Sequence, residues 1–77
     1  MAIKLNKKDR AILEDLAQPK VELQIGDNQL VVFPDDDYYS ITMKTADRLI
    51  ESGAVEFTQT RGRGRDKIAI YTLADRA

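Results

Sequence analysis

The sequence predicts a single small α+β domain, and three observations support that fold class. Two segments place apolar residues at helical spacing, four segments alternate in the manner of strands, and glycine or proline separates most of them. The predicted order is α-β-β-α-β-β, with two hairpins in one antiparallel sheet and both helices on one face. All 77 residues belong to this domain, and the tail at about residues 74–77 is expected to fray.

The first helix is predicted over residues 7–18. Asn6 is a good N-cap, Asp9 places a negative charge in the first turn, and Pro19 stops the helix. One face carries the apolar residues Ile12, Leu13, Leu16 and Ala17. This face is therefore expected to pack on the sheet.

A hairpin follows the first helix. Residues 21–25 alternate apolar and polar side chains, residues 26–28 form a turn, and the apolar residues 30–33 return along the first strand. Residues 34–37 are interpreted as a polar connection, because a proline is followed there by three aspartates.

Ser40 or Thr42 is expected to cap the second helix, which ends at Gly53. Its inward residues are Met43, Ala46, Leu49 and Ile50. Residues 54–60 and 67–73 then form the second hairpin.

The composition argues against catalysis. The chain contains neither cysteine nor histidine, which removes the commonest nucleophile–base pairs and transition-metal ligands. The residues 35–37 lack the spacing of a calcium loop, so no metal site and no cofactor is expected. Without cysteine, a cytoplasmic location is the default, and no apolar run is long enough to predict a membrane partner. We expect a protein that is not an enzyme.

The segment TQTRGRGRDK concentrates positive charge in a chain whose formal net charge is only −1. Its basic residues are Arg61, Arg63, Arg65 and Lys67, opposed by Asp66 alone. Arginine forks suit phosphate oxygens, and the intervening glycines allow close approach of the backbone, so this loop is a candidate nucleic-acid contact. The alternative is a solvated turn between two strands.

About residues 42–75 resemble the second half of a winged-helix DNA-binding domain. The segment reads as a helix ending in LIESG, a strand, a basic glycine-bearing wing and a strand ending in YTL. The resemblance implies that an exposed helix face meets nucleic acid together with the wing. The residues implied are Lys44, Thr45, Arg48 and Glu51 on the helix, and Arg61, Arg63 and Arg65 in the wing.

Aromatic and apolar residues outside the expected core suggest a second function. Tyr71 and Leu73 lie on the strand face opposite Ile68 and Ile70, so this patch is either covered by a helix or forms a partner surface. Tyr38 and Tyr39 are further interface candidates. Two hypotheses therefore remain: a nucleic-acid-binding or regulatory module acting through the arginine loop, or a protein–protein interaction or homodimerisation module with no role in nucleic-acid binding.

Overall fold

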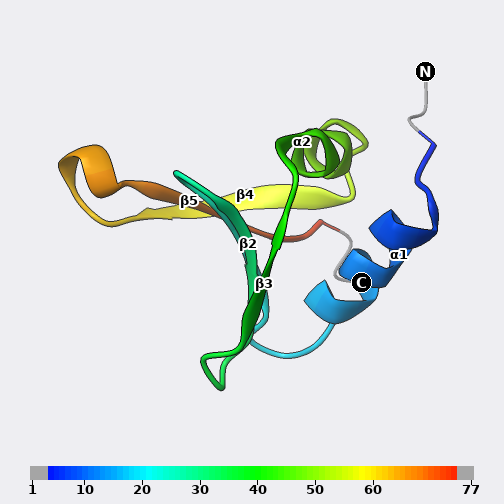
Figure 1. The fold of residues 1–77 in the computed structure, drawn as a ribbon, viewed down its shortest axis with the longest axis horizontal. Coiled ribbons are helices and arrows are strands. Elements are labelled where there is room, and N and C mark those ends of the chain that lie inside the picture. The colour runs from blue at the N-terminus through cyan, green and yellow to red at the C-terminus, as the bar shows by residue number, and fades with distance from the viewer. Residues whose placement is uncertain (1–3, 75–77) are drawn as a thin grey trace.

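The computed structural model describes residues 4–74, which form two helices, five strands and one short 3-10 turn (Figure 1). In chain order the elements are α1 (Lys7–Leu16), β1 (Glu22–Ile25), β2 (Gln29–Val32), β3 (Tyr38–Ile41), α2 (Met43–Glu51), β4 (Val55–Arg61), η1 (Gly64–Asp66) and β5 (Ile68–Leu73). This confirms the α+β class. Of the tail expected to fray, residues 75–77 lie outside the described residues, and the Ala74 amide donates to the Ala54 carbonyl at 3.0 Å.

The sheet is antiparallel at every strand pair, in the order β3-β2-β1-β5-β4. The first three strands form a meander, and β4 and β5 form a long hairpin. The two parts join where β1 pairs with β5, with Leu23 opposite Tyr71. The hairpin extends away from both helices (Figure 1), and we call it the β4–β5 arm.

The strand β3 corrects the predicted order, which becomes α-β-β-β-α-β-β. The polar connection at residues 34–37 is a tight turn: the Phe33 amide donates to the Asp37 carbonyl at 2.8 Å, and Asp36 adopts a φ of +69°. Aspartate tolerates this left-handed conformation better than most residues. Exposed and half-buried residues alternate along β3. The exposed residue Tyr38 is aromatic, so the sequence does not show the polar–apolar alternation that is typical of a strand.

Helix capping agrees with the sequence. Asn6 and Asp9 form a reciprocal capping box at the start of α1, and Thr42 is the N-cap of α2. The helix α1 ends at Leu16, earlier than predicted, and Ala17 is its C-cap. Among residues 4–74, no helix has the length and apolar character needed to cross a bilayer.

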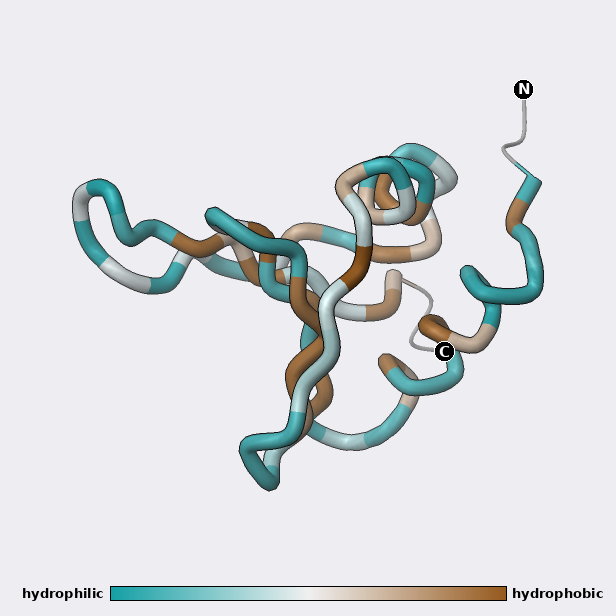
Figure 2. The backbone as a smooth tube through the Cα atoms, viewed as in Figure 1, coloured by the Kyte–Doolittle hydropathy of each residue, from teal (hydrophilic) through white to brown (hydrophobic). Residues whose placement is uncertain are grey.

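One core joins both helices to the sheet. Its buried members are Ile12, Leu16, Val21, Leu23, Val31, Leu49 and Val55. Leu23 and Val31 are directly opposite each other on β1 and β2, so they lie on the same sheet face. In Figure 2 the hydrophobic segments gather where strands and helices meet, whereas the tip of the arm and the β2–β3 turn are hydrophilic.

The face of β5 that packs on the core is the opposite of the one expected from the sequence. Tyr71 and Leu73 pack against this core, so the alternative of a patch covered by helices is the one that the structure favours. Ile70, expected on the core side, lies on the other face opposite Gln24 and is only 1% exposed. Both faces of β5 carry apolar residues, which is why the alternation did not reveal the side that faces the helices.

Candidate functional site

The tip of the β4–β5 arm has a defined backbone. Gly62 and Gly64 have φ of +93° and +59°, a region that glycine adopts without steric cost. The amide of Asp66 donates to the carbonyl of Arg63 at 3.0 Å and closes the turn η1. The turn therefore fixes where the basic side chains start. These side chains are Arg63, Arg65 and Lys67, which we call the tip cations.

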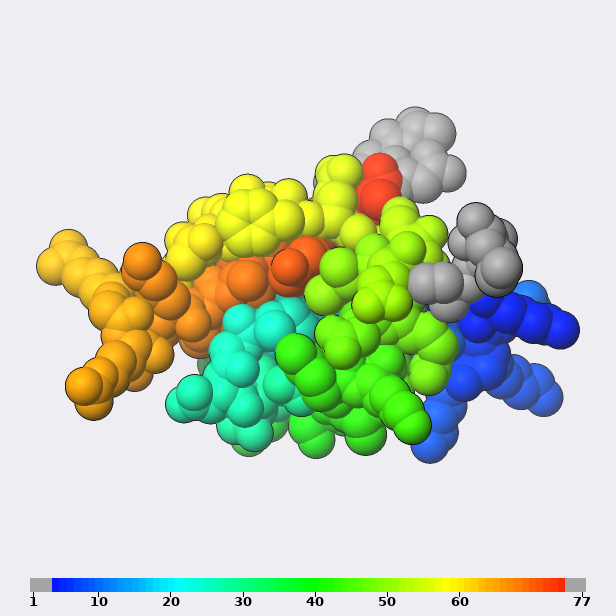
Figure 3. Space-filling model, turned by 90° about the horizontal axis from the view of Figure 1, so that it is seen from above, coloured from blue at the N-terminus to red at the C-terminus, as the bar shows by residue number. Residues whose placement is uncertain are grey.

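The tip cations are exposed and lack ion-pair partners within the described residues. Between residues 4 and 74, ion pairs form only at Arg48–Asp9 and Arg61–Glu22. Asp66 is the single acidic residue of the turn. In the space-filling view the arm projects from the body, at the end of the molecule opposite α1 (Figure 3). Positive charge is thus presented at the end of the molecule opposite α1.

Arg61 differs from the tip cations, although the sequence grouped all four basic residues. Its Nη1 donates to Glu22 Oε1 at 2.8 Å and Nη2 donates to Oε2 at 3.5 Å. Because β5 lies between β4 and β1, this ion pair spans β5 on the face that carries Ile70. The alkyl part of a long arginine can cover apolar surface in this way, and Ile70 on this face is 1% exposed.

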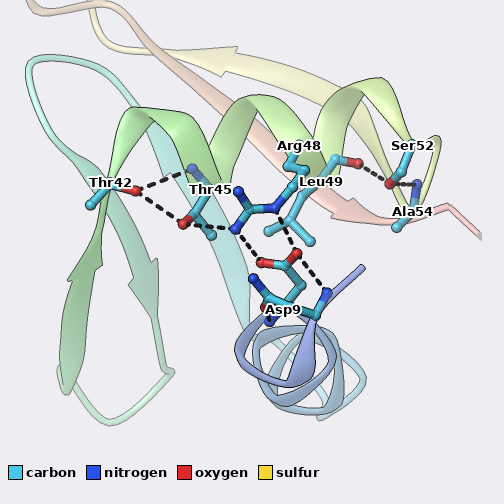
Figure 4. A network of polar contacts seen from close by, with 8 residues as sticks. Asp9, Thr42, Thr45, Arg48, Leu49, Ser52 and Ala54 are labelled. Carbon is cyan, nitrogen blue, oxygen red and sulfur yellow. Dashed lines mark hydrogen bonds and ion pairs between the residues drawn. The ribbon is translucent and has the colours of Figure 1, made fainter. Parts of the chain in front are cut away.

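Arg48 is engaged within the fold. Its Nε donates to Asp9 Oδ2 at 2.7 Å and its Nη2 donates to Asp9 Oδ1 at 2.9 Å (Figure 4). Asp9 is fully buried, and its Oδ2 also accepts from the Asn6 amide at 3.1 Å. The hydrogen bonds from Arg48 hold the pKa of Asp9 below its ordinary value, against the opposing effect of burial. This pair joins α1 to α2, so Arg48 is not a free contact for a ligand.

The Asp9–Arg48 pair was not predicted from the sequence, although a signal for it is present there. Asp9, Ile12 and Leu16 follow helical spacing, so Asp9 continues the buried stripe of α1. A carboxylate on an apolar stripe requires a cationic partner. Of the other helix residues implied by the resemblance, Lys44 and Glu51 are exposed on α2 and Thr45 is half-buried.

A hollow of about 180 Å³ lies beside the tip, between the β1–β2 turn and η1. Its walls come from two segments that are distant in sequence: Gln24, Gly26, Asp27, Asn28, Leu30, Arg65, Asp66, Lys67 and Ile68. Two of the tip cations thus stand at a recess with aliphatic and polar walls. The sequence analysis singled out no side chain of the β1–β2 turn, because only the fold brings that turn next to η1.

A second groove, of about 500 Å³, lies between α1, β3 and the start of α2. The Tyr39 hydroxyl lies along it and donates to Asp15 Oδ2 at 2.6 Å. Burial, reinforced by this carboxylate, raises the pKa of Tyr39 above its ordinary value. Tyr39 therefore ties β3 to α1.

Among the four predicted interface residues, Tyr38 is the one that is mostly exposed, at 62%. The others are half-buried: Tyr39, Tyr71 and Leu73. Phe57, which the sequence analysis did not select, is 56% exposed on β4 and packs edge-on against Tyr71 with ring centroids 5.8 Å apart. Tyr38 and Phe57 stand on the two edge strands of the sheet.

Asp36 and Asp37 form hydrogen bonds within the β2–β3 turn. Asp37 Oδ1 accepts from the Tyr38 amide at 3.0 Å, and the Asp36 amide donates to the Phe33 carbonyl at 3.2 Å. Among residues 4–74, no three acidic side chains gather as metal ligands would.

Replacing Gly62 with alanine is expected to disrupt the tip, whereas Gly64→Ala should be mild. A Cβ on Gly62 would lie 2.5 Å from the Asp66 carbonyl oxygen in addition to the strain of its positive φ, while a Cβ on Gly64 meets nothing within 4 Å. We expect a loss of about 2–3 kcal/mol for Gly62→Ala and about 1 kcal/mol for Gly64→Ala in urea unfolding. Equal losses would show that the tip does not hold this conformation.

Comparison of the chain with protein-family models, with curated proteins and with solved structures finds no match. The candidate site therefore rests on the geometry of the chain itself. Its distinguishing features are the tip cations and the hollow beside them.

Proposed function

We propose that this protein binds nucleic acid and that the tip cations contact the phosphates. One observation carries the proposal: Arg63, Arg65 and Lys67 stand together on a defined turn, without ion-pair partners in the described chain, at the end of a projecting arm. Folding alone does not require three unpaired cations at such a place. Phosphate groups are the ligands that arginine forks and lysine ammonium groups meet most readily in nucleic acid.

The distribution of charge supports this proposal although the chain as a whole carries a formal charge of −1. The aspartates of the β2–β3 turn lie at a different corner of the molecule from the arm (Figure 1). A phosphate backbone can therefore approach the tip cations without first meeting those aspartates, and at moderate salt the screening length is about 8–10 Å. We expect a contact with few phosphates, and hence binding that is strong only at low salt.

The test is fluorescence anisotropy with labelled duplex and single-stranded DNA and with RNA over a series of salt concentrations. A variant with Arg63, Arg65 and Lys67 replaced by alanine should bind much more weakly at low salt, and its salt slope should become shallower by about 2–3, as expected for three lost phosphate contacts. The matched control replaces three exposed basic residues of α1, at the other end of the molecule: Lys7, Lys8 and Arg10. It removes the same charge and should keep the slope.

Two outcomes would contradict the proposal. Absence of binding by the wild type at low salt would show that the tip is only a solvated turn. Equal losses in the two triple variants would show that any binding follows overall charge rather than the tip. Urea unfolding of each variant checks that it is folded, and exposed substitutions of this kind are expected to change stability by about 0.5 kcal/mol or less.

Exposed aromatic residues favour a second candidate, association of the protein with itself or with another protein. Tyr38 and Phe57 are more than half exposed, and each stands on an edge strand, where unpaired backbone groups can accept another strand. This function predicts a concentration-dependent mass in sedimentation experiments that Phe57→Ser reduces and the triple tip variant leaves unchanged. A constant monomer mass at all concentrations would exclude the homodimer.

A further inference from the structure

The hollow beside the tip is small, and its walls are partly apolar and partly polar. Its volume of about 180 Å³ equals that of about six water molecules in the liquid and is below the roughly 300–1,000 Å³ typical of pockets for drug-sized ligands. Leu30 and Ile68 supply apolar wall, and Asn28 supplies an amide. Such a recess accommodates a single ring system rather than an extended molecule.

Charged groups of both signs line the hollow. Arg65 and Lys67 are donors, and the carboxylates of Asp27 and Asp66 are acceptors. The two positive and two negative charges balance, so the hollow by itself does not attract anions. Its two cations are also tip cations, which we propose to hold phosphate. A ligand that matches both properties carries a phosphate next to an uncharged ring with several hydrogen-bonding groups. Nucleotides have this combination.

We infer that the hollow receives one unpaired nucleobase, preferably guanine, from a single strand whose phosphates are held by the tip cations. This inference rests on the proposed function. Guanine presents adjacent N–H donors at N1 and N2, which a carboxylate accepts together, and acceptors at O6 and N7, which a cation can serve. Thymine offers a single N–H donor and no amino group, and a base stacked in a duplex cannot enter a recess of this kind.

The test uses single strands of thymidine about twelve nucleotides long, in which one internal position is dT, dG, dA, dC or abasic. We expect the strand with one dG to bind about tenfold more tightly than the abasic strand, which corresponds to one well-formed pair of base contacts. Equal affinities for the five strands would overturn the base site while leaving the proposed phosphate contact intact. Absence of binding by all five strands, and by duplex DNA and RNA, would overturn the proposed function as well.

Charge substitutions in the hollow give a sharper test, because they are expected to move two quantities in opposite directions. Replacing Asp27 and Asp66 with asparagine removes the carboxylates and two negative charges. Affinity for the all-dT strand should rise several-fold, while the preference for dG falls to twofold or less. The matched control is the double variant Asp35→Asn and Asp36→Asn, which makes the same charge change in the β2–β3 turn and should keep the preference. A preference retained without Asp27 and Asp66 would overturn the role of these carboxylates.

A free guanine nucleotide carries the same two chemical groups as the strand. Guanosine monophosphate is therefore the competitor that distinguishes the two sources. We expect it to displace the dG strand only at concentrations far above the dissociation constant of the strand, because it offers one phosphate to three tip cations. Displacement at an equal concentration would show that the ligand is a free nucleotide and would overturn the assignment of a strand.

Discussion

Replacing Asp9 with alanine is expected to lower the free energy of unfolding by about 2–3 kcal/mol. The substitution leaves the guanidinium of Arg48 without its partner beside the core, and it removes half of the capping box with Asn6. Arg48 keeps 30% of its side chain exposed, so water compensates part of the loss and the cost stays below that of a fully buried pair. For a chain of 77 residues, total stability of about 4–12 kcal/mol makes this a large fraction.

Three further variants separate the ion pair from simple loss of contacts. Arg48→Met keeps an alkyl chain but leaves the buried carboxylate unpaired, and it should cost about as much as Asp9→Ala. The double variant should be less destabilised than the sum of the two single variants by about 1 kcal/mol or more. Arg10→Met, at an exposed position of α1, should change stability by about 0.5 kcal/mol or less. Additive effects at Asp9 and Arg48 would show that the pair contributes no coupling energy.

The Asp9–Arg48 pair makes the stability of the protein depend on pH in the acidic range. The pKa of Asp9 is lowered in the folded protein from an ordinary value of 3.8, so its contribution is fully present above that pH. It is lost as pH falls below 3.8 through the folded pKa, because protonation of Asp9 ends the ion pair. The free energy of unfolding, measured with urea at a series of pH values, should therefore fall more steeply below about pH 4 for the wild type than for Asp9→Asn. Parallel curves would assign the acid sensitivity to other carboxylates.

Replacing Leu23 with alanine is expected to lower the free energy of unfolding by about 3 kcal/mol. Leu23 is fully buried where the meander joins the β4–β5 arm, with Val31 opposite on one side and Tyr71 on the other. A cavity there loosens both strand pairings at once. Circular dichroism during urea unfolding measures the effect directly.

Leu30 provides the matched control for Leu23. It lies on the neighbouring strand β2, on the opposite face of the sheet, and is only half-buried. Leu30→Ala removes the same atoms and should cost about 1 kcal/mol or less, because water already reaches this site. A loss at Leu30 equal to that at Leu23 would mean that the second face contributes as much to stability as the core between sheet and helices.

Local patterns predicted most of the individual elements and little of how they meet. Asn6, Thr42 and the apolar stripes were sufficient to place both helices, since capping and periodicity act within a few residues. The strand β3 was missed because an exposed Tyr38 hides its alternation and because Asp36 closes a turn by adopting a conformation that is unusual outside glycine.

The candidate site was predicted only in part, because local patterns do not show which distant residues come into contact. The concentration of arginines at the tip is visible along the chain, but the partners of Arg48 and Arg61 are not, because Asp9 and Glu22 are distant in sequence. Two of the six basic residues predicted to contact nucleic acid, Arg48 and Arg61, thus form ion pairs within the protein. The hollow could not be anticipated, since it forms only where the β1–β2 turn and η1 come together.

The pairing of β1 with β5 has a consequence for how the chain folds. The β1–β2–β3 meander and the β4–β5 arm can each form from neighbours in sequence, but β1 and β5 must close a loop that includes β2, β3, α2 and β4. Loop closure of this length costs entropy before any contact compensates it, so this pairing is expected to limit the folding rate. The Asp9–Arg48 pair also links an early helix to a later one. Neither half should therefore persist alone, and the chain should fold as one cooperative unit.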